Sequence, residues 1–459
     1  MQPNLLSTPS DELRLPNPIQ AVVNTICKSA ELFGYWKRSY RNAATSYEEM
    51  SFWDICYWFY KNTNPITEVE KGQQATTMLA TDKNIVGLPQ GFEKQASLTI
   101  GAAGDLIQSS TLEHSKDVLY EGIEDILFDQ TISYASLEVP ISADEPEKQP
   151  LTDKACPTEY STIAQFDAFK GHQDKRFTVL HTATNHMFDA GVEGVQTTQK
   201  ILAKEGTLDV GTNNTPDTFG RGTILTKEGI KIGFASAGFG LNGHEMPEAE
   251  SYRIHAAKLL PKSAEPELDI LKQQIEDCKA QQCDFIIASL HWGYEFEMFP
   301  RKRQVDMAHM LVEWGADAVL GHHPHVIQPI EYYRTKRDPD RVAVIAYSLG
   351  SLAWTCSAPY LVLSAILNFT VSKGTVDGQE RTYIEHTNVT PVFRDYAYSN
   401  GQLITRIEKL ANHLAESNDA DRQHHIAQIK HYADLVLGDG YVSEAISEPV
   451  GAPASKVAA

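Results

Sequence analysis

Three histidines lie within four positions of the segment Gly321-His322-His323-Pro324-His325, directly after the mainly apolar run at residues 316–320. Imidazole is the commonest metal ligand in proteins. A glycine before the cluster and a proline inside it indicate a tight turn, which would let His323 and His325 point the same way from the end of a strand. The alternative is a polar surface turn rich in histidine, because short motifs often match by chance. The choice depends on what the rest of the chain offers.

Other residues of ligand type also follow apolar, strand-like runs. Taken singly, an aspartate after a glycine is a common turn signal, and a lone histidine at a strand end is more often structural. Taken together they favour one site, because the strand ends at one edge of an α/β sheet are where such sites collect. Oxygen and imidazole donors in this mixture suit Mn, Fe or Zn, and they are numerous enough for two divalent ions. The candidates are Asp105 after residues 98–103, Glu138 after 131–137, Asn185 and His186 after 177–183, and His291 after 285–290.

The elements that would position these residues alternate between strand-like and helical patterns from Ser97 onward. This alternation predicts an α/β architecture. Beyond the strands named above, the pattern predicts strands at 230–235 and 342–347 and a hairpin turn at 227–229. It predicts helices at 117–129, from 191 through 202, at 265–280 and at 303–314.

Residues 18–62 are rich in aromatic side chains interleaved with charge. The spacing predicts two short amphipathic helices, the second capped by a Ser-x-x-Glu box of Ser46 and Glu49. Aromatic residues at helical spacing are more often core than a platform for a partner or substrate, so we expect a helical extension that docks on the main domain. The end of the chain, residues 442–459, drifts into Ala, Ser, Pro and Glu and is predicted to be disordered.

Composition limits the class of protein. The 459 residues exceed the roughly 250–300 residues of a usual single core, so we expect one large domain with appended segments, or two domains. A net charge of -20 argues against a nucleic-acid partner. Six cysteines without a Cys-x-x-Cys pair suit reduced thiols. With no secretory signal and no run near the roughly 20 apolar residues of a membrane span, we expect a cytoplasmic protein.

The order of the motifs resembles a known family. The chain closely resembles the CapA capsule-synthesis (poly-γ-glutamate synthesis) family, within the calcineurin-like metallophosphoesterase superfamily, over roughly residues 95–395. The resemblance implies an α/β fold, a four-layer α/β/β/α metallophosphoesterase-like sandwich, here with the helical extension at 1–94, further helices at 396–441 and the tail at 442–459. The motifs are Gly104-Asp105, Ser136-Leu137-Glu138, Asn185-His186-x-x-Asp189-x-Gly191, His291-Trp292-Gly293-x-Glu295-x-Glu297, the histidine cluster and Tyr347-Ser348-Leu349-Gly350.

Roles are carried over by motif. The resemblance implies that His186 is the proton donor near the leaving group, and Asp189 of the same motif is a second catalytic candidate. His322, Trp292, Glu295 and Ser351 are candidate substrate-binding residues. The implied metal ligands are Asp105, Glu138, Asn185, His291, His323 and His325.

Two functions remain open from the sequence. The first is a metal-dependent hydrolase in which two divalent ions activate water against a phosphoester or a γ-glutamyl or other amide bond of a small or oligomeric substrate. The second is a non-catalytic accessory protein of capsule polymer synthesis or export. A full set of metal ligands favours the first. Neither the substrate nor the oligomeric state follows from the sequence.

The chain departs from the family pattern at two positions. Ser136 stands where the family usually has asparagine before Leu-Glu, and Ser351 stands where asparagine usually follows Ser-Leu-Gly. Altered hydrogen bonding around a metal ligand commonly costs about 10- to 100-fold in affinity or activity. Many family members also carry an N-terminal membrane anchor where this chain has its aromatic extension.

Overall fold

Two facing β-sheets form the centre of the computed structural model, which describes residues 5–13, 15–73, 85–107, 112–144, 156–415 and 419–438. The first sheet contains β1 (Glu93–Leu106), β2 (Ile132–Leu137), β7 (Val179–His181), β8 (Leu208–Val210), β15 (Ser351–Ala353), β16 (Leu363–Val376), β17 (Gln379–Ser399) and β18 (Gln402–Lys409). The second contains β9 (Thr223–Lys227), β10 (Ile230–Gly238), β11 (Phe285–His291), β12 (Ala318–His322), β13 (Ile330–Arg334) and β14 (Val342–Ala346). Short strand pairs lie outside them: β3 (Ile141–Ser142) with β4 (Ser161–Thr162), and β5 (Gly171–His172) with β6 (Lys175–Arg176).

Both sheets contain a parallel part. In the first, the order is β18-β17-β16-β1-β2-β7-β8, with β15 beside the end of β1. Strands β1, β2, β7 and β8 run parallel, and β16 to β18 are antiparallel. In the second, β10, β11, β12 and β14 run parallel between the antiparallel edge strands β9 and β13. Parallel strands place their carboxyl ends at the same edge, so polar residues that follow them come together.

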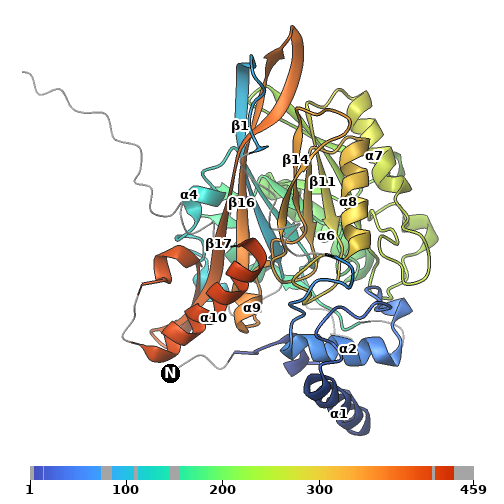
Figure 1. Ribbon diagram of the computed structural model, residues 1–459, viewed down its shortest axis with the longest axis vertical. Helices are drawn as coiled ribbons and strands as arrows, with labels where there is room; N and C mark the ends of the chain where they lie inside the picture. Colours follow the sequence, from blue (N-terminus) through green and yellow to red (C-terminus); the bar gives the residue numbers. More distant parts are fainter. Residues whose placement is uncertain are drawn as a thin grey trace, which may run out of the picture.

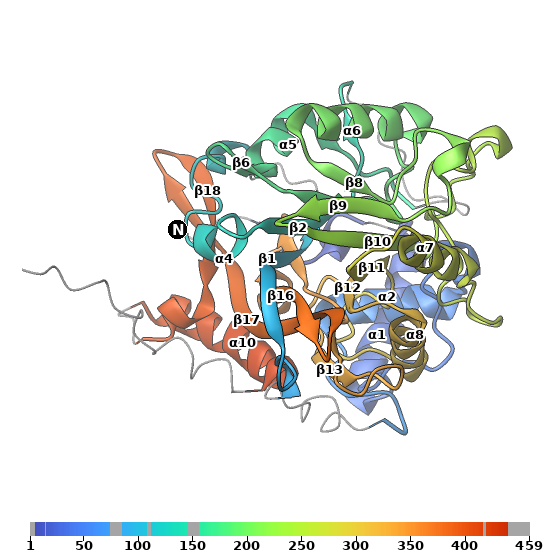
Figure 2. The ribbon, with the colours of Figure 1, turned by 90° about the horizontal axis from the view of Figure 1, so that it is seen from above.

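Helices cover the outer face of each sheet (Figure 2). Helices α4 (Glu124–Leu127), α5 (Ile163–Phe169) and α6 (Gly191–Glu205) lie on the first sheet, and α7 (Asp269–Ala280) and α8 (Lys302–Trp314) lie on the second. The apolar core between the sheets joins Ile100 and Val179 of the first to Phe285 and Leu320 of the second. Separate apolar clusters lie under the two outer helical layers. The predicted four-layer α/β/β/α sandwich is therefore confirmed.

Most of the predicted elements are present, with shifted ends. The strands, the helices α6, α7 and α8, and the hairpin before β10 are found; the turn uses Glu228 and Gly229, both with positive φ (48° and 75°). The helix predicted at 117–129 is wrong. Only Glu124–Leu127 are α-helical there, although Leu119, Ile123 and Leu127 are fully buried as the apolar spacing predicted. Residues 116–123 form turns instead, so this apolar face is buried without a continuous helix.

The N-terminal extension forms the two expected helices, α1 (Asn17–Phe33) and α2 (Phe52–Thr63), at one end of the molecule (Figure 1). Tyr57 and Tyr60 are buried in the same apolar cluster as Ile345 of the second sheet. Backbone hydrogen bonds also join the segment after α2 to the main domain. The Ile66 N–H donates to the Phe296 carbonyl and the Met298 N–H donates to the Ile66 carbonyl, both at 2.9 Å.

A buried ion network also joins the extension to the main domain. The Glu297 carboxylate accepts two hydrogen bonds from Arg301, at 2.9 and 2.7 Å, and one from the Tyr57 hydroxyl at 3.1 Å. The Lys61 ammonium lies 3.5 Å from the same carboxylate. Burial alone would raise the pKa of Glu297, but Arg301 and Lys61 hold it below its usual value. Removing one member would leave a buried charge without its partner, so the extension is integral to the fold.

The capping residue of α2 differs from the sequence prediction. Ser51 precedes the helix, its hydroxyl accepts from the Asp54 N–H at 3.4 Å, and the Asp54 carboxylate accepts from the Ser51 N–H at 2.7 Å. Ser46, the predicted cap, instead precedes a three-residue 3-10 turn, Tyr47–Glu49, and its hydroxyl bonds to the Glu48 carboxylate. A capping box therefore does begin α2, as predicted, but it starts at Ser51, five residues after the predicted Ser46.

We expect Ser51→Ala to lower the free energy of unfolding by about 0.5–2 kcal/mol, because α2 would lose its N-terminal cap. Denaturant unfolding measures the change. Ser46→Ala is the matched control and should change the same quantity by about 0.5 kcal/mol or less, since the Ser46 hydroxyl, among the residues that the structure describes, bonds only to the exposed Glu48 carboxylate. Equal losses in the two variants would contradict the assignment of Ser51 as the cap.

The C-terminal part differs from the expectation of helices at 396–441. Strand β17 runs to Ser399 and β18 (Gln402–Lys409) adds an edge to the first sheet before α10 (Ala420–Leu437), which packs beside β16 and the short helix α9 (Pro359–Val362). The tail predicted at 442–459 lies outside the described residues. Within the described part of the chain, no helix combines the length and apolar character required to cross a bilayer.

Candidate metal centre

The carboxyl ends of strands from both sheets meet at one site. Asp105 is the penultimate residue of β1 and His291 is the last residue of β11, whereas Glu138 directly follows β2. The backbones approach each other closely there. A Cβ on Gly104 would lie 2.0 Å from the Gly350 carbonyl oxygen, and a Cβ on Gly321 would lie 2.1 Å from that of Tyr347, so only glycine fits at either position.

Five of the six candidate ligands form two groups that could each hold a cation. The first group is Glu138, His291 and His323, and the second is Asp105, Glu138 and His325; within each group the donor atoms all lie within 4.8 Å of one another. Glu138 belongs to both. Its Oε1 lies 3.7 Å from His291 Nε2 and 3.6 Å from His325 Nε2. This arrangement suits a carboxylate shared between two ions.

Asn185, the sixth candidate, lies next to these groups. The hydroxyl of its neighbour Thr184 donates to the Glu138 carbonyl at 2.6 Å, which ties the segment after β7 to the one after β2. The Asn185 amide donates to the Asn242 side-chain oxygen at 3.1 Å, and this leaves its own side-chain oxygen buried without a partner. That oxygen is available as a ligand.

Unsatisfied polar atoms test whether these residues fit metal ions. A buried polar atom without a partner costs about 1–3 kcal/mol, so native structures contain few of them. Here several coincide in one place, on the residues predicted as ligands, and divalent cations would satisfy them. The atoms are Glu138 Oε2, Asn185 Oδ1, His291 Nδ1 and Nε2, and His323 Nδ1. The donor set fits two divalent cations.

The electrostatics of the site agree with this interpretation. Burial, and then the nearby Asp105 carboxylate, raise the pKa of Glu138 well above its usual value, as expected for a carboxylate that lacks a positive neighbour. Burial and the neighbouring imidazoles lower the pKa of His291 and of His323, and burial lowers the pKa of His325 to about 4. The histidines are therefore neutral near pH 7, which is the form that binds metal.

The segment after β12 bends sharply, as Gly321 and Pro324 predicted. His323 and His325 have φ values of 94° and 58°, in the left-handed region that few residues other than glycine adopt. Such backbone costs on the order of 1–3 kcal/mol per residue and is found at functional sites. The distortion brings both imidazoles into the two ligand groups.

Three residues predicted to bind substrate are buried in this structure, beside candidate ligands or in the core. The Ser351 hydroxyl lies 3.1 Å from His325 Nδ1, which leaves His325 Nε2 facing Glu138. His322 Nδ1 lies 3.1 Å from Asp105 Oδ1, and its Nε2 lies 2.9 Å from the Tyr134 hydroxyl. Trp292 donates to the Tyr347 carbonyl at 3.2 Å. The Ser351 hydroxyl and the His322 ring thus adjoin candidate metal ligands, and Trp292 packs in the apolar cluster of the second sheet. The assignment of these residues to substrate binding stays a prediction.

His186 is positioned by a carboxylate. Its Nδ1 lies 2.7 Å from Asp189 Oδ2, and the same oxygen accepts from the Glu159 N–H at 2.8 Å. Asn242 Nδ2 approaches the other ring nitrogen at 3.2 Å. Burial alone would lower the pKa of His186, but the Asp189 carboxylate and its hydrogen bond raise it above the usual value. The ring can therefore carry a proton beside the ligand groups.

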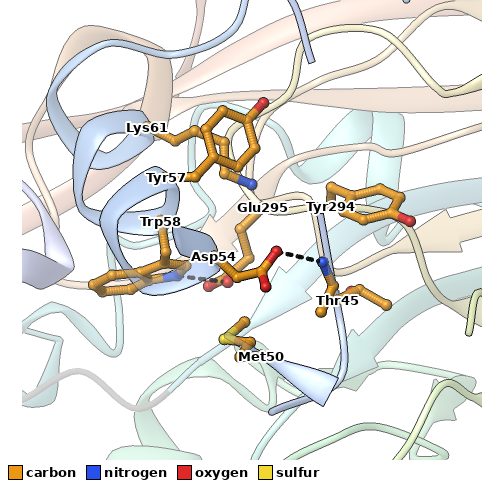
Figure 3. Close-up of a pocket in the computed structure, with 9 residues that line it drawn as sticks. Thr45, Met50, Asp54, Tyr57, Trp58, Lys61, Tyr294 and Glu295 are labelled. Atoms are coloured by element: carbon orange, nitrogen blue, oxygen red, sulfur yellow. Dashed lines mark hydrogen bonds between the residues drawn. The ribbon is translucent and has the colours of Figure 1, made fainter. Parts of the chain in front are cut away.

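A small pocket beside the ligands has walls from two distant parts of the chain (Figure 3). Tyr294 and Glu295 form one wall, and the Glu295 carboxylate accepts from the Trp58 indole at 2.7 Å. Burial raises the pKa of Glu295. The wall from the extension consists of Ala44, Thr45, Met50, Asp54, Tyr57, Trp58 and Lys61.

Sequence reasoning singled out Glu295 but missed Thr45, whose hydroxyl lies 3.4 Å from His323 Nε2. The aromatic content of the extension pointed to packing, and no local signal marked this threonine.

Comparison with known proteins now identifies the family. The family model described as "Bacterial capsule synthesis protein PGA_cap" matches residues 99–354. The chain belongs to this capsule synthesis family. The resemblance to CapA seen in the sequence is thereby confirmed, and the family is connected with capsule and poly-glutamate synthesis. The matched region includes all six candidate ligands and leaves out α1 and α2.

Relatives of the capsule synthesis family carry related names. The chain is 27% identical to the PGA biosynthesis protein CapA of Bacillus subtilis (strain 168) over 289 residues, which cover 63% of this chain and 70% of that protein. It is 27% identical to the capsule biosynthesis protein CapA of Bacillus anthracis over 278 residues, 58% of this chain and 62% of that one. A probable polyglutamine synthesis accessory protein of Mycobacterium tuberculosis (strain ATCC 25618 / H37Rv) is 28% identical over 165 residues, 34% of this chain and 42% of that one. The match therefore spans less than two thirds of the second and third relatives.

Proposed function

We propose that the chain is a metal-dependent hydrolase that cleaves a phosphoester or a γ-glutamyl or other amide bond. The observation that carries this proposal is the sharing of Glu138 between two buried ligand groups. Asp105, Glu138, Asn185, His291, His323 and His325 would hold two divalent ions, Mn, Fe or Zn. When bound, such ions lower the pKa of a water molecule toward neutrality and polarise the bond to be cleaved.

The protein side chains would supply the proton transfer. His186 directly follows Asn185, the sixth candidate ligand, in the chain. The Asp189 carboxylate favours the protonated form of His186. A protonated imidazole can donate to the leaving group as the bond breaks. The Asp189 carboxylate accepts the Nδ1 proton of His186, so the proton to be donated would be carried by Nε2, and the Asn242 amide next to Nε2 would move aside when the substrate binds. Asp189 would thus orient the proton donor without contacting the substrate itself.

The substrate class comes from the family and from the names of its members. We propose a small or oligomeric substrate of capsule or poly-γ-glutamate synthesis. A second candidate function is that of a non-catalytic accessory protein, and the word "accessory" in the name of the mycobacterial relative favours it. A purely accessory role would leave the buried, unsatisfied ligand atoms without a purpose.

Metal analysis and hydrolysis assays on the full chain would test the proposal. We expect about two ions per chain and turnover of an aryl phosphate or a γ-glutamyl peptide. A chelator should abolish this turnover, and adding back Mn, Fe or Zn should restore it. The chelated protein, kept folded, serves as the control. Two bound ions with no turnover above this control on either substrate would favour the accessory function.

A further inference from the structure

Thr45 of the N-terminal extension lies between a backbone carbonyl and a candidate metal ligand. Its hydroxyl donates to the Gly293 carbonyl at 2.7 Å and lies 3.4 Å from His323 Nε2. The Thr45 side chain is buried, and these contacts bridge more than 240 positions of the sequence. Thr45 also lies outside the region matched by the family model.

The hydrogen-bond roles at this position follow from the chemistry of a hydroxyl group. A hydroxyl has one proton to donate, and that of Thr45 is used on Gly293. Thr45 can therefore only accept from His323, which requires the proton of the neutral imidazole to sit on Nε2. The other nitrogen, Nδ1, then carries the free lone pair, and it is the nitrogen of His323 that is buried without a partner.

Several contacts hold Thr45 in this place. The N–H of its neighbour Ala44 donates to Asp54 Oδ1 at 3.0 Å, and the same carboxylate pairs with the Lys262 ammonium at 2.6 Å. The Phe239 ring also packs against the imidazole, with 4.5 Å between the ring centroids. The His323 ring is thus fixed by Phe239 and, at its Nε2 end, by Thr45.

We propose that Thr45 is a positioning residue of the metal centre, which selects the tautomer of His323 that presents Nδ1 to the metal. The proposal rests on the proposed function insofar as it requires His323 to bind an ion. It makes the N-terminal extension a part of the metal centre in addition to a docking segment. Partners of this kind at the second nitrogen of a ligating histidine commonly contribute about 10- to 100-fold to metal affinity.

The test compares Thr45→Val with Thr45→Ser in the full chain. Valine keeps the shape of threonine and removes the hydroxyl, whereas serine keeps the hydroxyl. Competition with a chromophoric chelator for Zn²⁺ should show about 10- to 100-fold weaker binding of one ion in Thr45→Val and near wild-type binding in Thr45→Ser. Thr45→Val also leaves the buried Gly293 carbonyl without its donor, so metal-free Thr45→Val should unfold at a lower denaturant concentration than Thr45→Ser. Metal affinities are therefore compared under conditions in which circular dichroism shows both variants to be folded, which separates loss of a ligand partner from loss of the fold.

A second measurement does not depend on either variant. Nitrogen NMR of histidine-labelled, metal-free wild-type protein reports which ring nitrogen carries the proton, with His323→Gln used to assign the signal. We expect the proton on Nε2. A proton on Nδ1, unchanged affinity in Thr45→Val, or equal losses in Thr45→Val and Thr45→Ser would each overturn the proposal. A wild-type chain that binds no ion would overturn both the proposed function and this inference, whereas the other results affect only the inference.

Discussion

Glu138→Ala is expected to remove both metal ions from the protein. Glu138 is the residue common to the two ligand groups, so its loss takes an oxygen donor from each ion at once. His291→Ala, by contrast, changes only the group of Glu138, His291 and His323, and should leave about one ion per chain. Elemental analysis after extensive dialysis gives the stoichiometry: about two ions in the wild type, about one in His291→Ala and close to none in Glu138→Ala.

A matched control separates ligation from general charge. Glu193→Ala removes a carboxylate from the exposed surface of α6 and should keep two ions. Circular dichroism of the metal-free variants would verify that each is folded. If Glu138→Ala retained one ion with wild-type affinity, the two groups would not share this carboxylate, and a single-ion site would be the better description.

His186→Asn should lower the rate of hydrolysis by about 10²- to 10⁴-fold and leave the metal content nearly intact. The physical reason is that a proton donor acts on the leaving group, whereas Asn185 next to it has the free side-chain oxygen suited to ligation. The loss should be smallest for a nitrophenyl ester, because nitrophenolate needs little protonation to leave. Rates for two aryl phosphates with different leaving groups, measured with metal content, give the comparison.

Asp105→Asn is the contrasting variant. It alters a carboxylate of the second ligand group, so it should weaken metal binding and reduce the rate for every substrate to a similar extent. Should His186→Asn lose metal as readily as Asp105→Asn, His186 would be a ligand, and the proton donor would have to be sought elsewhere around the site.

The sequence was informative about the site because several of its candidate ligands lie at the ends of strands with a strong apolar pattern. The runs before Asp105, Glu138 and His291 are apolar and buried, so their ends could be located within a few residues. Because the strands of each run are parallel to their neighbours, these ends lie at the same edge of each sheet. The Gly321 to His325 segment also carried its own turn signal. Local pattern therefore predicted which residues meet, without any knowledge of the distances between them.

What the sequence could not provide were contacts decided by tertiary packing. Ser351 and His322 are polar residues of a type that often binds substrate. Only the folded chain shows that both are buried beside the candidate ligands His325 and Asp105. Ser46 and Ser51 both begin a plausible capping box; in the folded chain Ser51 caps α2, and its partner Asp54 also pairs with Lys262 of the main domain. In the sequence, Thr45 looks like any other polar residue. It contacts His323, which lies 278 positions further along the chain.

The central place of β1 has a consequence for the synthesis of the protein. Asp105 lies in β1, and the antiparallel partner of that strand is β16, where Ile100 pairs with Phe369. A ribosome that adds about 5–20 residues per second needs on the order of 10–50 s to reach β16 after β1 has been made. During this interval one edge of β1 has no partner of its own and can pair with other nascent chains. Pairing of this edge of β1, the strand that carries Asp105, therefore has to wait until most of the chain has been synthesised.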